Sequence, residues 1–292
     1  MTAYNKQDYA LELRLRELDP ALHRRFTDAV FALQHVLSNY KLIFPEFTDH
    51  TELHSLTVID FCNRLIGDQL SELNADEIYA LLMGCYFHDT GMGISEKDFH
   101  AFSEEIDFGD YFETHSRENK ARIIRDFHNE FSGCFIRKYA DFFELPSKEH
   151  LFAVIEIARG HRKTSLIDEK AYPIALSVPN GNTICLPYLS ALIRLADEID
   201  VTAARNPILL YHTDLVVDPQ QIFYRRMHEA VRDLHITKDA FTLMIRTDDP
   251  KVWDALEQLA QKMQHTLNEC KEAVLLRTSY VITQERIVLH AI

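Results

Sequence analysis

Apolar side chains recur every three or four positions through most of residues 22–200, which is the period of a helix with one buried face. Asn74 followed by Glu77 is the pattern of a capping box, which opens a helix. Pro146 and Pro187 mark a helix end and a helix start, because proline is tolerated only outside a helix or in its first turn. The sequence therefore predicts a mainly α fold, a helical bundle with helices over residues 22–44, 54–70, 75–89, 116–144, 147–160 and 187–197.

Two segments break the helical period. Gly91, Gly93 and Gly109 indicate a loop over residues 90–110. Alternating apolar residues on both sides of Asn180-Gly181 predict a small β-hairpin insertion, because Asn-Gly favours the tight turns of hairpins.

The pattern changes again after Pro207. Residues 235–246 predict a strand pair, 250–274 a helix and 279–290 one or two strands. We therefore expect a helical domain, residues 1–206, and a small C-terminal α+β appendage, residues 207–292, either packed on the core or standing apart. The appendage holds no chemical motif, and its strands suit support of the core, a lid, a partner surface or the edge of a homodimer.

Charge and cysteine usage restrict the partners and the environment. The 31 basic and 45 acidic residues give a net charge of −14, which disfavours binding to long nucleic acid. The charged N-terminus has no apolar signal core, and no apolar run is long enough for a membrane helix, so we expect a cytoplasmic protein without membrane contact. The cysteines are expected to be reduced and mostly buried: Cys62, Cys85, Cys134, Cys185 and Cys270.

An ordered set of histidines and aspartates lies on the apolar faces or at the ends of the predicted helices. A lone histidine or aspartate in such a place is usually a core or surface residue. Five segments that each place a histidine or aspartate there are not expected by chance, because an unpaired imidazole or carboxylate that points into the core is costly. The set predicts cations at a common centre, with His54, His88, Asp89, His128, His161 and Asp197 as ligands.

The donor types narrow the chemistry. Imidazole and carboxylate ligands suit Mn, Fe, Co, Ni or Zn, and Mg is also compatible with the carboxylates. Six ligands exceed the three or four of one catalytic zinc, so we expect two divalent metal ions with Asp89 as the bridge. Two such ions activate a shared water for attack on phosphorus, which predicts hydrolysis of a phosphoester or phosphoanhydride with His88 and Asp89 at the catalytic centre.

This order of residues resembles the HD-domain metal-dependent phosphohydrolases. The matching stretches are TDHTELHSL at 48–56, YFHDTGMG at 86–93, FHNEFS at 127–132, IARGHR at 157–162 and RLADEID at 194–200. The resemblance implies an all-helical core and hydrolysis of phosphate esters or anhydrides of nucleotides, including cyclic and signalling nucleotides. It also implies one metal set of His54, His88, Asp89 and Asp197, and a second metal on His128 and His161 that Asp89 bridges.

The sequence departs from the best-known branches of that family. Met92 stands where the cyclic-dinucleotide phosphodiesterases carry a lysine, and their Gly-Tyr-Pro signature is absent. Arg-Gly-His at 159–161 replaces the tandem histidine often found in the fourth motif, and the alarmone hydrolases, which bind one metal, would not need His128 and His161. The set is closer to bacterial HD proteins that open with T-D-H-x-x-x-H and end with R-L-A-D-E-x-D.

Basic residues beside the motifs are candidates for binding a small phosphorylated or nucleotide ligand: Arg162, Lys163 and Arg205. Surface charge, or pairing with Glu198 or Asp200, is the alternative. His50, four residues before His54, is a candidate general acid, a candidate partner of a metal ligand, or a loop-packing residue.

Two other functions use the same ligand set. One is a metal-containing module that senses a nucleotide without turnover. The other is a di-iron oxygenase of the HD type.

Overall fold

The computed structural model describes residues 9–45, 50–162, 164–205 and 219–292, and most of these residues are helical. The helical part comprises α1 (Ala10–Leu18), α2 (Pro20–Ser38), α3 (Tyr40–Ile43), α4 (Glu52–Ile66), η1 (Gly67–Glu72), α5 (Ala75–Phe87), η2 (Thr90–Gly93), α6 (Glu96–Ser103), α7 (Tyr111–Thr114), α8 (Lys120–Lys138), α9 (Lys148–Gly160), α10 (Leu186–Glu198) and η3 (Ala203–Arg205). A short hairpin, β1 (Leu176–Ser177) and β2 (Thr183–Ile184), precedes α10. The predicted mainly α fold is confirmed.

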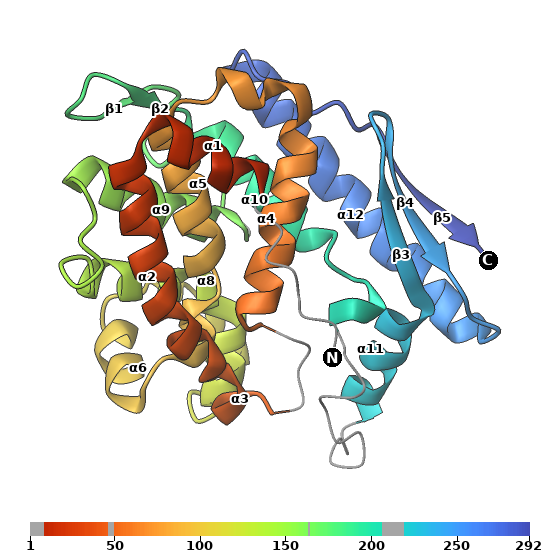
Figure 1. The fold of residues 1–292 in the computed structure, drawn as a ribbon. Coiled ribbons are helices and arrows are strands. Elements are labelled where there is room, and N and C mark those ends of the chain that lie inside the picture. The colour runs from red at the N-terminus through yellow and green to blue at the C-terminus, as the bar shows by residue number, and fades with distance from the viewer. Residues whose placement is uncertain (1–8, 46–49, 163, 206–218) are drawn as a thin grey trace.

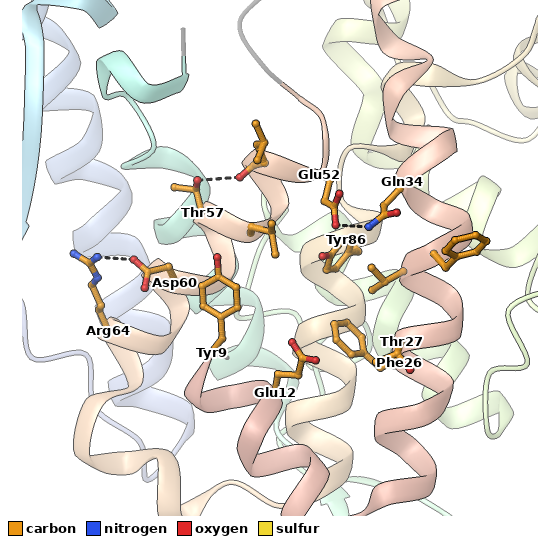
Figure 2. Close-up of a pocket in the computed structure, with 14 residues that line it drawn as sticks. Tyr9, Glu12, Phe26, Thr27, Gln34, Glu52, Thr57, Asp60, Arg64 and Tyr86 are labelled. Atoms are coloured by element: carbon orange, nitrogen blue, oxygen red, sulfur yellow. Dashed lines mark hydrogen bonds and ion pairs between the residues drawn. The ribbon is translucent and has the colours of Figure 1, made fainter. Parts of the chain in front are cut away.

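Helix α5 lies at the centre of the bundle, surrounded by α1, α2, α4, α9 and α10 (Figure 1). Every residue from Asp76 to Phe87 is buried, so this helix has no face exposed to solvent. The predicted capping box opens it: the Asn74 side chain accepts from the Glu77 backbone N–H, and the Glu77 carboxylate accepts from the Asn74 N–H. A pocket opens on one side of α5, between α1, α2 and α4 (Figure 2).

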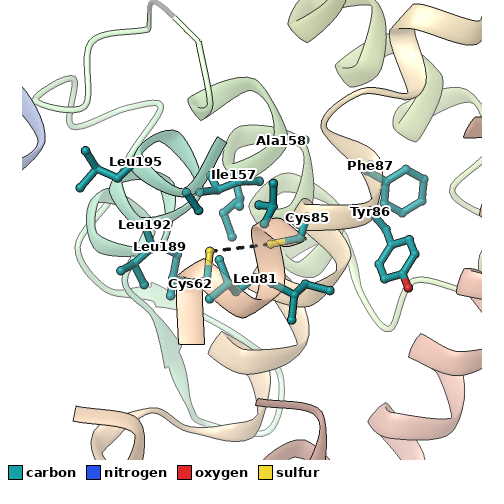
Figure 3. Packing of buried hydrophobic residues seen from close by; sticks show 14 of the residues in the cluster. Cys62, Leu81, Cys85, Tyr86, Phe87, Ile157, Ala158, Leu189, Leu192 and Leu195 are labelled. Atoms are coloured by element: carbon teal, nitrogen blue, oxygen red, sulfur yellow. Dashed lines mark hydrogen bonds between the residues drawn. The ribbon is translucent and has the colours of Figure 1, made fainter. Parts of the chain in front are cut away.

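The other side of α5 packs tightly against α4, α9 and α10 (Figure 3). Gly84 permits this approach, because a Cβ at this position would lie 2.4 Å from Cγ2 of Ile157 on α9. The Cys62 and Cys85 sulfurs lie 4.0 Å apart in this layer, and all five cysteines are free thiols on buried residues, as expected. Close packing fixes α4, α5, α9 and α10 as one rigid unit, and these helices lead into the histidine and aspartate motifs.

Two sequence-based expectations for the helical part are wrong in detail. Residues 90–110 are not a loop throughout, because they contain η2 and the eight-residue helix α6, which Ser95 caps and whose Phe99 and Phe102 are buried. The glycines mark only the ends of this region. The expected helix 116–144 is shorter, since α8 begins at Lys120 after the Asn119 cap and ends at Lys138.

The N-terminal region also differs from the expected single helix. α1 was not predicted, and the segment 22–44 divides into α2 and α3 at Asn39. Asp19 caps α2 by accepting from the backbone N–H groups of Ala21 and Leu22. This cap separates α1 from α2 and turns the chain between them.

The hairpin forms as predicted. β1 and β2 pair antiparallel, with Leu176 opposite Ile184, and Gly181 in the turn has φ +92°, a conformation that favours glycine. Asn180 and Asn182 donate from their side chains to Oδ2 of Asp76, at 2.9 and 2.7 Å, so the hairpin is anchored to the first turn of α5.

The C-terminal part contains α11 (Pro219–Ala230), β3 (Val231–Ile236), β4 (Ala240–Ile245), α12 (Pro250–Arg277) and β5 (Arg286–Ala291). The long helix is confirmed, and a strand pair forms as predicted but begins earlier, at Val231 instead of residue 235. Helix α11 was not predicted. β3 pairs antiparallel with β4, and β5 lies parallel to β4 on its other side. Helix α12 packs between α10 and the sheet (Figure 1).

The predicted boundary near residue 206 falls within 206–218, outside the described residues, and the two-domain division stays a prediction. The packing of α12 on α10 does show that the C-terminal elements contact the helical core. In the part of the chain that the structure describes, no helix is long and apolar enough to cross a bilayer.

Candidate metal centre

The six predicted metal ligands come from five segments and meet at one place. His54 lies on α4, His88 and Asp89 follow α5, His128 lies on α8, His161 follows α9 and Asp197 lies on α10. Their donor atoms form overlapping groups within 4.8 Å, namely His54, His88 and Asp197, and Asp89, His128 and His161. A third group joins His50 and His54 to Asp89.

The turn after α5 is held against α8. The Ser132 hydroxyl donates to the His88 carbonyl at 2.6 Å and accepts from the Gly91 backbone N–H at 2.9 Å. A Cβ on Gly91 would lie 2.2 Å from the His128 carbonyl oxygen, so only glycine permits this approach. The turn therefore sets the position of His88 and Asp89 relative to His128.

Gly91→Ala is expected to lower the free energy of unfolding by about 2 kcal/mol, because the new methyl group meets backbone atoms that cannot rotate away. Urea unfolding followed by circular dichroism measures this. Gly109→Ala is the matched control: its site has open space but a positive φ of 54°, so its cost comes from backbone strain alone. If both variants lost the same small amount of unfolding free energy, the close approach of the Gly91 turn to α8 would be contradicted.

The backbone orients three of the imidazoles in the same way. The Nδ1 atoms of His88, His128 and His161 lie 2.9, 2.7 and 2.5 Å from the carbonyl oxygens three residues earlier, those of Cys85, Arg125 and Ala158. A carbonyl oxygen only accepts, so each Nδ1 carries a proton and each ring directs its Nε2 into the cluster. His54 is oriented by a carboxylate instead, with Nδ1 2.7 Å from Oδ2 of Asp200.

The inward nitrogens face each other in pairs. The Nε2 atoms of His128 and His161 are 2.8 Å apart, and those of His54 and His88 are 3.1 Å apart. Two lone pairs at this distance repel unless a positive charge lies between them. Neutral imidazoles whose other nitrogen is bonded to a carbonyl or carboxylate are the usual protein ligands of divalent metals. The donor set therefore fits metal ions.

The two carboxylate oxygens of Asp89 face different pairs of histidines. Oδ2 lies 3.3 Å from Nε2 of His88 and 3.5 Å from Nε2 of His54, whereas Oδ1 lies 3.4 Å from Nε2 of His128. Asp197 adds an oxygen on one side only, with Oδ1 3.2 Å from Nε2 of His54. This arrangement provides one donor group on each side of Asp89.

The pKa shifts of the clustered residues also indicate that positive charge is favoured at the centre. Burial disfavours a charged His88, yet the carboxylates of Asp89 and Asp197 raise its pKa to about 9. Burial likewise opposes ionisation of Asp89, but the charges of His88 and His50 hold its pKa well below the usual range. Burial lowers the pKa of His128 to about 4, helped by the nearby Arg162 guanidinium, so this ring is neutral at pH 7. The carboxylates of Asp89 and Asp197 are thus balanced by a proton on His88, where a cation would serve equally well.

The predicted ligand-binding residues differ in their positions. Arg162 lines the cleft beside the cluster, and its guanidinium has no hydrogen-bond partner among the described residues. Arg205 also lines it, donates to the Asp200 carbonyl at 3.0 Å and has Nη2 3.3 Å from Nε2 of His54. His50 is bonded through Nδ1 to Oδ2 of Asp89 at 2.8 Å. Lys163 lies outside the described residues.

Other residues of the site were not singled out from the sequence. Asp200 orients His54, and its place three residues after Asp197 on the same short motif was the available signal. The cleft, of about 280 Å³, also takes one wall from α11, through Gln221, Tyr224 and His228. No sequence signal connects α11 to the cluster, because the contact depends on how the C-terminal elements pack.

A family model matches most of the chain. No curated protein and no solved structure matches the chain. Residues 44–269 match the model of the family described as HD-CE, a stretch that covers more than half of the 292 residues and includes all six predicted ligands. The predicted resemblance to HD-type proteins is confirmed at this level, and the chain belongs to the HD-CE family of HD-type domains.

Proposed function

We propose that this protein is a metal-dependent phosphohydrolase that cleaves a phosphoester or phosphoanhydride bond in a nucleotide or a similar small phosphorylated molecule. One observation carries the proposal: the cluster of buried histidines and aspartates opens into a cleft with a cationic rim. That rim consists of Arg125, Arg162, Arg205 and Lys262. Lys262 pairs with Glu198 at 2.8 Å, and Arg205 lies 3.8 Å from Asp200. The Arg162 guanidinium has no such partner among the described residues, so it favours an anionic ligand in the cleft.

The donor geometry supports two cation sites that share Asp89. His54, His88 and Asp197 would hold one ion, and His128 and His161 the other. Nitrogen and oxygen donors of this kind suit Mn, Fe, Co, Ni or Zn, with Mg as a further option for the carboxylates. When bound, two divalent ions supply a water molecule of lowered pKa and neutralise charge on the phosphate oxygens.

The protein's own groups position the ligands and the substrate. His50 and the His88 ring lie against Oδ2 of Asp89 and fix its carboxylate. Asp200 holds His54 in the orientation that directs Nε2 inward. Guanidinium groups bind phosphate oxygens through paired N–H donors, so we assign Arg162 and Arg205 to the non-bridging oxygens of the substrate.

The test is a hydrolysis screen of cyclic, linear and triphosphate nucleotides with Mn²⁺, before and after chelation. The proposal predicts a product that disappears on chelation and returns on adding the metal. Micromolar nucleotide binding without product would instead favour a sensing module. A visible spectrum from protein-bound iron, with oxygen consumption and no phosphate release, would favour the oxygenase alternative.

Arg162→Ala is expected to raise KM for the hydrolysed nucleotide about tenfold and to leave metal content unchanged, because it removes a charge-assisted hydrogen bond to substrate but no metal donor. Steady-state kinetics and elemental analysis measure both. Arg137→Ala, an exposed arginine on α8 paired with Glu105, is the control that removes the same charge outside the cleft. The same KM in both variants would refute the assignment of Arg162.

A further inference from the structure

The pocket between α1, α2 and α4 is separate from the metal cleft. It has a volume of about 740 Å³ and shares no lining residue with the cleft (Figure 2). Glu12 of α1, Gln34 of α2, Glu52 of α4 and Tyr86 of α5 contribute its polar groups. The proposed hydrolysis needs none of these four residues.

The pocket carries an excess of negative charge. Asp60 is neutralised by Arg64, whose Nη2 lies 2.6 Å from its Oδ2. Glu52 has only a neutral partner, Gln34, which donates to Oε1. Glu12 has Oε1 3.2 Å from Nε2 of His23. The Oε2 atoms of both glutamates have no hydrogen-bond partner among the described residues, so each carboxylate keeps an acceptor for a ligand.

The hydroxyl of a largely buried tyrosine, Tyr86, points into the same space. The Tyr86 side chain is only 3 % exposed, its ring packs edge-on against Phe26 with centroids 5.8 Å apart, and its hydroxyl has no hydrogen-bond partner among the described residues (Figure 2). Burial raises the pKa of Tyr86, as do the charges of Glu52 and Glu12, so the hydroxyl is protonated at neutral pH. The side chain is almost fully enclosed and lines the pocket, so its unpaired hydroxyl is available to hydrogen-bond a ligand bound there.

The remaining walls are aromatic and aliphatic. Tyr9 and Phe26 face the pocket with Glu12 (Figure 2), and Phe31 on α2 is 71 % exposed at its edge. Aromatic faces attract organic cations and cover methylene groups. The carboxylates here do not form a compact metal-binding group within the described part of the chain. The lining therefore favours an organic cation over a metal ion.

We propose that this pocket binds a small aliphatic diamine or polyamine. Its ammonium groups bind the carboxylates of Glu12 and Glu52, the Tyr86 hydroxyl accepts a further N–H, and its carbon chain lies against Tyr9 and Phe26.

Calorimetric titration of the full chain with 1,4-diaminobutane tests the proposal. Glu12→Gln and Glu52→Gln are each expected to weaken binding about tenfold, because each removes one charge-assisted hydrogen bond. Tyr86→Phe is expected to weaken it about fivefold, the value of one neutral acceptor. Glu17→Gln is the matched control: it lies on α1, is 69 % exposed and does not line the pocket, so affinity should not change.

Four results would overturn the proposal. The first is no saturable heat with the diamine, and the second is equal binding of 1,4-butanediol, which has the same length without the charges. The third is wild-type affinity in both glutamine variants with the far-UV circular dichroism of the native protein. Binding of a pentalysine peptide without binding of the diamine would also reject a small-molecule ligand.

Discussion

Asp89→Ala is expected to lower kcat/KM for nucleotide hydrolysis about 1000-fold or more, which corresponds to about 4 kcal/mol of lost transition-state stabilisation. The reason is the position of this carboxylate. Oδ2 faces His54 and His88, whereas Oδ1 faces His128, so one substitution removes a donor from both sides of the cluster. Kinetics on the nucleotide identified by the screen, with metal content on the same sample, measure the effect.

The loss must be separated from unfolding. Asp89→Asn keeps the shape and one oxygen, and both variants should retain the far-UV circular dichroism of the helical bundle. Asp68→Ala is the control for charge, because its side chain is 95 % exposed on η1 and, among the described residues, pairs with the exposed Lys238 alone. Turnover by Asp89→Ala within a few fold of the Asp68→Ala rate would refute the central role of this carboxylate.

Asp76→Ala is expected to lower the free energy of unfolding by about 3 kcal/mol. Asp76 is 1 % exposed and accepts from Nε2 of His150 at 2.8 Å and from the side chains of Asn180 and Asn182. It therefore joins α5, α9 and the hairpin. Alanine leaves the buried His150 and the side-chain amides of two exposed hairpin residues, Asn180 and Asn182, without their acceptor. Urea unfolding at pH 7 measures the loss.

The same residue predicts a pH dependence. Burial opposes ionisation of Asp76, but the hydrogen bonds from His150, Asn180 and Asn182 lower its pKa to about 2 from the ordinary 3.8. A folded-state pKa below the unfolded one stabilises the protein above pH 3.8, and this contribution of about 2 kcal/mol is lost as the pH falls toward 2. The stability difference between wild type and Asp76→Ala should thus shrink between pH 5 and about pH 2.5. A difference that stays constant over this range would contradict the ionised hydrogen-bonded state.

Sequence periodicity predicted the long helices that carry the cluster, because each of them buries one apolar face or, like α5, all of its faces. The six residues of the cluster were predicted together, since inward imidazoles and carboxylates are unusual on such faces. The structure brings them within reach of one another, and their roles as ligands remain predictions.

What the sequence did not predict depends on contacts between distant segments. The short helix α6 was not predicted because glycines flank it on both sides. Helix α11 was not predicted because it lacks the long apolar period of the bundle helices. The parallel pairing of β5 with β4 requires α12 to return the chain along the sheet, which no local pattern encodes. The acidic pocket beside Tyr86 likewise lies between α1, α2 and α4. Each of its polar residues looks like an ordinary surface residue in the sequence.

The most direct test of the two-cation account is metal content by elemental analysis, on protein purified without a metal-affinity tag, for the wild type and His128→Ala. His128 contributes to the side of Asp89 that it shares with His161, and it lies on a different helix from His54. The account predicts about two metal ions per wild-type chain and about one in the variant, because only one of the two sites loses a nitrogen donor. One ion or none in the wild type, or the same content in both proteins, would contradict it.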